Sequence, residues 1–317
     1  MVKLFLGNRA GVLLFIPVLV AIYIGLNFQS NYYSQEDFSN LGLWGEAVAI
    51  FPLGANIFAA LLICLNAFGI NWIFNTNEFL ERNSYMSSLL YVILMSFYHS
   101  FYSLDGMLIA HTCIILMLFQ FFKLRQNEDG RRHAFNGAFF AGLAASFHPP
   151  MVAMVPVVLI MLWSIRPFVF RETILVLLGF GIPLLYGGVF MWYSGHGIEL
   201  QILEQTTNYF QKQTDFLVMS VLFTLLFLLS LVSISGKMQK SSIRLKKLVR
   251  ILWLLVVLGI LFGLADFIFF RQIERFSFLM IPLSFFLTFS FSNKTFGLMA
   301  TVLFYLTLLY SLINFFL

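Results

Sequence analysis

Long apolar runs alternate with short polar stretches along this chain of 317 residues. An α-helix needs about 20 consecutive apolar residues to cross the hydrocarbon layer of a bilayer. Most of the runs approach that length, so we expect about 11 membrane helices. Their predicted ranges are 10–28, 47–70, 85–104, 107–122, 134–148, 151–165, 173–193, 216–235, 251–270, 276–292 and 296–316. The pattern predicts an all-α, polytopic transmembrane helix bundle, with residues 1–317 forming a single integral membrane domain.

The composition supports lipid as the main solvent of this chain. Hydrophobic residues make up 60% of it and charged residues 10%, whereas a soluble domain carries about 25% charged residues. The 40 phenylalanines suit bulky, lipid-facing packing rather than catalysis.

The lysines and arginines are distributed unevenly across this threading. If the N-terminus lies inside, 16 of the 19 fall on the inner side and 3, Lys212, Arg271 and Arg275, on the outer side. Cytoplasmic loops carry the excess of basic residues, so we expect a multi-pass protein of the bacterial inner (cytoplasmic) membrane with a cytoplasmic N-terminus and a periplasmic C-terminus. The net charge is +5, and the basic residues of the cytoplasmic loops are expected to face anionic lipid headgroups. Nucleic acid is not an expected partner.

The range 134–165 is the weakest part of the threading. Each half is short for a span, and the break is Pro149-Pro150, which the interior of a helix tolerates badly. Either two thin helices meet at the outer surface, or a re-entrant hairpin dips in from the cytoplasm. Both alternatives return the chain to the same side.

Polar groups on the outer side are candidates for chemistry. His99 and His111 fall at matching depth on the predicted helices 85–104 and 107–122, with Asp105 in the turn between them, and His148 precedes the Pro-Pro break at the same face. Such a group suggests metal binding or acid–base chemistry. The alternative is hydrogen bonding within a helix bundle, because no histidine spacing here matches a known ligand motif.

A second outer group surrounds the end of the range 251–270. Arg271 and Arg275 stand where basic residues are disfavoured, and an arginine fork suits phosphate. The alternative is pairing with Glu274 to order a short loop. Asp266 lies inside the apolar run, where an acid marks a functional site by default or pairs with one of these arginines.

Glu36 and Asp37 follow the first predicted helix, within the stretch NYYSQEDFSNLGLWGE. Tyr32, Tyr33 and Trp44 are expected to anchor this outer loop at the membrane interface. On composition alone the acidic pair belongs either to a solvated loop or to a reactive site.

Three stretches together resemble the GT-C fold of polyprenyl-phosphate-dependent glycosyltransferases. They are the pair Glu36-Asp37 in the first outer loop, GAFFAGLAASFHPPMVAMVPVVLIML (137–162) and ERFSFLMIPLSFFL (274–287). Residues 137–162 resemble a helix pair of that fold, a Gly-rich helix, a polar Pro break and an aliphatic helix. The whole chain also resembles an uncharacterised family of polytopic membrane proteins known mainly from Bacteroidota.

The resemblance implies a function at the periplasmic face. The protein would transfer a glycosyl group from a polyprenyl-phosphate carrier, with Glu36 or Asp37 as the catalytic carboxylate or as ligand to a divalent metal. Arg275, together with Arg271, would contact the lipid phosphate, and Asp105 would match an acid of the second outer loop. The first outer loop is much shorter than in those enzymes.

Two other functions remain open. A transporter or flippase would use Asp266, His99 and His111 as intramembrane polar groups on a pathway. A non-catalytic subunit or scaffold of an envelope assembly would need no motif, and it would bind a membrane-protein partner.

Overall fold

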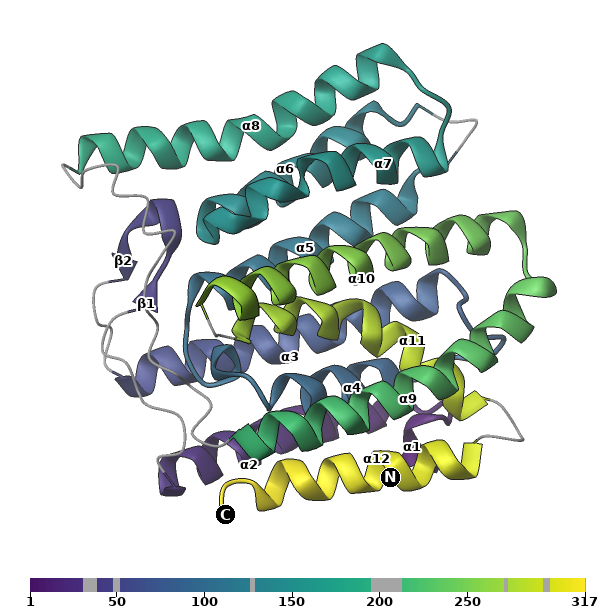
Figure 1. The fold of residues 1–317 in the computed structure, drawn as a ribbon. Coiled ribbons are helices and arrows are strands. Elements are labelled where there is room, and N and C mark those ends of the chain that lie inside the picture. Colours follow the sequence, from purple (N-terminus) through teal and green to yellow (C-terminus); the bar gives the residue numbers. More distant parts are fainter. Residues whose placement is uncertain are drawn as a thin grey trace.

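The computed structural model describes residues 1–30, 39–47, 52–125, 129–194, 213–270, 273–292 and 297–316. Helices dominate these residues, as the apolar runs predict, and each predicted range overlaps a helix (Figure 1). Among the described residues, seven helical stretches are long and apolar enough to cross a membrane. They are Ala10–Ser30, Gly54–Thr76, Gly106–Lys123, Phe170–Tyr193, Leu217–Gln239, Ile243–Phe269 and Glu274–Phe291. The protein is therefore a helical membrane protein.

The remaining predicted spans correspond to shorter helices. These are α4 (Met86–Met95), α6 (Arg131–Phe147), the 3-10 helix η4 (Pro149–Met154) with α7 (Val155–Ile165), and α12 (Gly297–Ile313). A total of about 11 membrane crossings therefore stays a prediction.

The longer elements run roughly parallel or antiparallel to one another through the bundle (Figure 1). After the short α1 (Val2–Phe5) and η1 (Ala10–Leu14), they are α2 (Phe15–Ser30), α3 (Pro52–Thr76), α5 (Gly106–Lys123), α8 (Phe170–Tyr193), α9 (Gln213–Gln239), α10 (Ile243–Phe270) and α11 (Met280–Ser292). Two 3-10 turns, η3 (His99–Phe101) and η5 (Glu274–Leu279), precede α5 and α11.

A small β hairpin is an element that the apolar pattern did not predict. Strands β1 (Ser39–Asn40) and β2 (Glu46–Ala47) pair antiparallel around η2 (Gly42–Trp44). Gly42 and Gly45 have φ values of 64° and 79°, which glycine adopts without strain. Trp44 of this hairpin donates a hydrogen bond from Nε1 to Ser146 Oγ at 3.0 Å. The hairpin therefore packs against the end of α6.

Glycines set the close packing of α6 against its two neighbours. A side chain at Gly137 would overlap the Phe121 ring of α5, and one at Gly142 would overlap the backbone of Phe180 in α8. The chain then breaks at His148 and returns through α7, and Gly130 before α6 lies against the Arg166 guanidinium after α7. The 134–165 segment thus returns to the end where it began, which both predicted alternatives require.

Helices differ in how much of their apolar surface faces outward. Every residue of α4 from Met86 to Met95 is buried, whereas α8 exposes large side chains such as Leu185, Tyr186 and Val189. Exposed apolar side chains of this kind suit contact with lipid. The bundle therefore has central helices enclosed by protein and outer helices that present an apolar face.

Phenylalanine fills the core as well as the outer surface, which corrects the expectation that it mainly faces lipid. Phe74, Phe79, Phe285 and Phe289 are buried. Their rings lie with centroids 5.3 to 6.3 Å apart where α3, α11 and the turn after α3 meet. Aromatic pairs at this spacing add stabilisation beyond the area that they bury.

The two ends of the bundle differ in chemistry. At the end we call the basic end, α3, α5 and α7 finish and α6, α8 and α10 begin, near Lys123, Arg166 and Arg244. At the η5 end, α10 finishes and η5 and α5 begin, near Asp105 and Arg275.

Candidate functional site

A group of polar side chains lies at the η5 end, contributed by η3, α5, the end of α6, α10 and η5. It contains all the outer candidates that fall within the described residues. Those candidates are His99, Asp105, His111, His148, Asp266 and Arg275. Glu36, Asp37 and Arg271 lie outside the described residues.

Asp105 has a clear structural role at the start of α5. Its Oδ1 accepts a hydrogen bond from the Leu108 backbone N–H at 2.7 Å, and its Oδ2 accepts one from Ser100 Oγ at 2.8 Å. An aspartate at this position satisfies an N–H that the first turn of the helix leaves open. A capping role was available from the sequence, because Asp105 stands directly before an apolar helix.

His99 does not lie on the predicted helix 85–104, so the prediction that His99 and His111 lie on adjacent antiparallel helices is wrong. The helix predicted over 85–104 ends at Met95, and His99 lies in the turn η3. Its ring Nδ1 is 3.0 Å from Ser103 Oγ, and its backbone N–H donates to Glu274 Oε1 at 3.1 Å.

Glu274 contacts a residue that the sequence did not suggest. Pairing with an arginine was one of two open alternatives for this cluster, and in the structure Glu274 Oε1 accepts a hydrogen bond from the His99 backbone N–H. Its other oxygen, Oε2, is buried and accepts no hydrogen bond from the described part of the chain. A buried carboxylate oxygen without a donor is costly, so this atom marks a place where a ligand, a water molecule or a proton is favoured.

His111 joins three elements in the interior. Its Nδ1 lies 3.3 Å from Tyr91 Oη of α4, and its Nε2 lies 3.2 Å from Ser277 Oγ of η5. The ring also packs on Phe278 with centroids 4.7 Å apart. This arrangement is the hydrogen bonding within a bundle that was the alternative to metal binding.

His148 is the residue at which α6 ends. Its ring centroid is 5.7 Å from that of Phe278. Its Nε2 is buried and has no hydrogen-bond partner among the described residues. Phe278 therefore contacts both His111 and His148, and it links the break after α6 to the interior of the polar group.

Asp266 and Arg275 form a buried ion pair. Arg275 Nη1 lies 2.9 Å from Asp266 Oδ1, and the side chains are 16% and 1% exposed. The short distance and the burial of both side chains make this a close ion pair in a setting with little water. The sequence left two interpretations of Asp266, a functional acid or the ion-pair partner of an arginine. The structure shows the ion pair, with Arg275.

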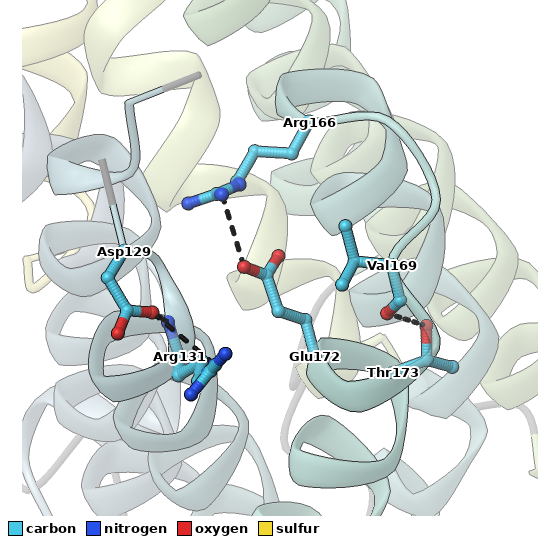
Figure 2. Close-up of polar contacts among 6 residues, drawn as sticks. All are labelled: Asp129, Arg131, Arg166, Val169, Glu172 and Thr173. Carbon is cyan, nitrogen blue, oxygen red and sulfur yellow. Dashed lines mark hydrogen bonds and ion pairs between the residues drawn. The ribbon is translucent and has the colours of Figure 1, made fainter. Parts of the chain in front are cut away.

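A second buried ion pair lies at the basic end, and the sequence did not predict it. Arg166 Nη2, after α7, lies 3.2 Å from Glu172 Oε1 in the first turn of α8. Figure 2 shows Arg166 reaching across to Glu172, apart from the pair formed by Asp129 and Arg131. Lys247 Nζ donates to the Ile165 carbonyl at 2.8 Å, so α10 is also tied to the end of α7.

Metal binding finds no support in the described residues, because no group of three His, Cys, Asp or Glu side chains there is placed to hold a metal ion. The comparisons with known proteins add no identification: no family model, no curated protein and no solved structure matches the chain.

The polar group at the η5 end combines a guanidinium, three carboxylates, three imidazoles and several hydroxyls in a largely buried setting. Interactions between charges are strong where water is excluded. Such a group is suited to holding an anion beside Arg275 or to exchanging protons.

Proposed function

We propose that this protein is a bacterial inner-membrane enzyme of the GT-C type, acting on a polyprenyl-phosphate carrier at its η5 end. In this proposal the basic end faces the cytoplasm and the η5 end faces the periplasm. Glu36 or Asp37 acts as general base on the acceptor or holds a divalent metal. Arg275 and Arg271 stabilise the departing lipid phosphate.

The observation that supports the proposal is a cluster of polar side chains at η5. Its members are Arg275 and Glu274 of η5, Asp266 of α10 and His148 at the end of α6. These residues come from segments that are far apart in the sequence. A buried ion pair is weak support for stability, and charged groups at membrane depth mark functional sites by default.

The pairing of Arg275 with Asp266 bears on how a phosphate would bind. The guanidinium has five N–H donors in a planar fork, and the contact with Asp266 engages Nη1. The Arg275 side chain is still 16% exposed. We therefore propose that a lipid phosphate approaches the outer edge of the fork while Asp266 orients the guanidinium from within.

The test is release of polyprenyl phosphate, a product that every donor of this class has in common. The purified protein in nanodiscs is incubated with a panel of synthetic undecaprenyl-phosphate monosaccharides together with a panel of glycan, peptide and lipid-linked acceptors that take up the sugar, with and without Mg²⁺ or Mn²⁺. We expect release with at least one donor and its loss in a Glu36→Gln/Asp37→Asn variant, while Glu81→Gln at the basic end keeps the activity. Release that survives the double substitution contradicts the proposal, and so does a wild-type protein that releases nothing from any donor.

A second candidate, proton-coupled transport, is favoured by two buried atoms of this polar group, Glu274 Oε2 and His148 Nε2, that have no hydrogen-bond partner among the described residues. Protons and water suit such positions in a membrane protein. Proton uptake by proteoliposomes under an imposed pH gradient tests this function. Uptake that persists in Glu274→Gln, His148→Gln and His111→Gln would remove it.

A further inference from the structure

A hollow at the basic end lies outside the polar group discussed above. It has a volume of about 400 Å³, within the usual range of ligand pockets. It lies between the ends of α3 and α5 and the starts of α6 and α10. Its lining residues are Thr76, Asn77, Phe119, Phe122, Lys123, Arg125, His133 and Arg244.

Several of these side chains are held in place by neighbours from other elements. Arg244 of α10 donates from Nη2 to Asn77 Oδ1 at 3.1 Å, just after α3. Lys123 Nζ lies 3.8 Å from the centre of the Phe119 ring. His133 Nδ1 of α6 lies 2.9 Å from Gln120 Oε1 of α5. The hollow is therefore built from four helices rather than from one flexible loop.

The charge of the lining has one sign. Lys123, Arg125 and Arg244 supply three permanent positive charges, and no carboxylate is found among the described residues that line the hollow. Buried Phe122 and half-buried Phe119 supply apolar surface beside these cations. Arginine guanidinium groups favour phosphate oxygens, and an apolar surface beside them lowers the local dielectric and strengthens the attraction.

We propose that this hollow binds a phosphate-bearing anion, either the headgroup of an anionic lipid or a soluble phosphate ester. The lipid source is compatible with the position of the hollow at the ends of apolar helices, where headgroups lie. The soluble source is compatible with the exposure of Lys123, Arg125 and Arg244. The inference does not depend on the enzyme proposed for the η5 end.

The competing explanation is that these residues only contribute to the general positive charge of the basic end, which attracts any anionic surface. A matched variant separates the two. Lys240, Lys246 and Arg250 are exposed residues of the same region and do not line the hollow. Neutralising either group of three removes the same total charge.

The experiment measures two ligands on the purified full-length protein in mild detergent. Native mass spectrometry follows binding of dioleoylphosphatidylglycerol, with dioleoylphosphatidylcholine as the neutral reference, and calorimetry follows binding of inorganic pyrophosphate. Loss of a charge-assisted contact weakens binding by about tenfold or more. We expect the Lys123→Gln/Arg125→Gln/Arg244→Gln variant to lose at least about tenfold for one ligand, and the Lys240→Gln/Lys246→Gln/Arg250→Gln variant to lose less than about threefold.

The ligand that shows this difference identifies the source of the phosphate. Equal losses in the two variants, or no selective binding of either ligand by the wild-type protein, overturn the proposal. Single substitutions Arg244→Gln and Lys246→Gln repeat the comparison if the triple variant does not fold, and equal binding by these two single variants overturns it as well.

Discussion

The two buried arginine–carboxylate pairs, one at each end of the bundle, place their acids in opposite helical settings. Glu172 lies in the first turn of α8, where the helix dipole favours an anion. Asp266 lies in the last turns of α10, which ends at Phe270, where the dipole disfavours one. The distances are similar, 3.2 Å for Arg166–Glu172 and 2.9 Å for Arg275–Asp266.

The comparison shows that burying an arginine–carboxylate pair costs a different free energy at the two ends of the bundle. Glu172 lies at a helix N-terminus and pairs with Arg166. Asp266 lies near a helix C-terminus and pairs with Arg275. An acid in such a position is hard to explain by topology or stability. We therefore connect the Arg275–Asp266 pair with function and the Arg166–Glu172 pair with holding the α6–α7 hairpin beside α8.

The largest expected effect is that of Arg275→Met. This substitution leaves Asp266 charged and almost fully buried, and removing one partner of a buried pair costs about 3–5 kcal/mol. Equilibrium unfolding of the purified protein in mixed micelles measures the loss. The neutral double variant Asp266→Asn/Arg275→Gln should recover most of it, and a loss below about 1 kcal/mol in the single variant contradicts an obligatory pair.

A smaller effect is expected from Gly142→Val, which tests the close packing of α6 against α8. A side chain at Gly142 meets the Phe180 backbone, and overpacking of this kind costs about 1–3 kcal/mol. Gly181→Ala in α8 is the matched control, because a side chain there meets nothing within 4 Å. The control should be neutral or up to about 1 kcal/mol more stable. Equal unfolding midpoints for the two variants would contradict the close contact of α6 and α8.

The substitution Arg166→Met should cost about 1–2 kcal/mol, less than Arg275→Met, because the first turn of α8 still stabilises Glu172. The double variant Arg166→Met/Glu172→Gln completes a thermodynamic cycle. A loss as large as that of Arg275→Met would show that the two pairs are equivalent, and the comparison would fail.

The smallest effect concerns the β hairpin at the η5 end. Trp44→Phe keeps an aromatic ring against Phe147 and Phe190 but removes the hydrogen bond to Ser146 Oγ. The expected loss is about 1 kcal/mol. Trp192→Phe, at a side chain that is 79% exposed, should change the unfolding free energy by less than about 0.5 kcal/mol.

The helices and part of the candidate site could be predicted from the sequence. Apolar runs locate helices because lipid leaves the backbone few other structures, and the possibility that Asp266 pairs with an outer arginine followed from its position in such a run. The early end of α4 could not be predicted, because Ser96, Phe97 and Tyr98 continue the apolar pattern while the chain leaves the helix. The contact of Glu274 with the His99 backbone depends on packing between distant segments, which no local pattern records.

The Arg166–Glu172 pair was missed for a related reason. Arg166 and Glu172 both lie in the polar stretch between the predicted helices 151–165 and 173–193. A spacing of six positions across a loop does not show that the two side chains form an ion pair. The acid in the first turn of an apolar helix was the available signal, and the structure adds its partner.

The most direct test of the central claim is binding of radiolabelled undecaprenyl phosphate to the protein in phosphatidylcholine nanodiscs. The wild-type protein is compared with two neutral variants, Asp266→Asn/Arg275→Gln and Glu172→Gln/Arg166→Gln. We predict that neutralising the pair at the η5 end weakens binding by about tenfold or more, and that neutralising the pair at the basic end leaves it within about twofold. Equal binding by all three proteins would contradict the claim that Arg275 contacts a lipid phosphate.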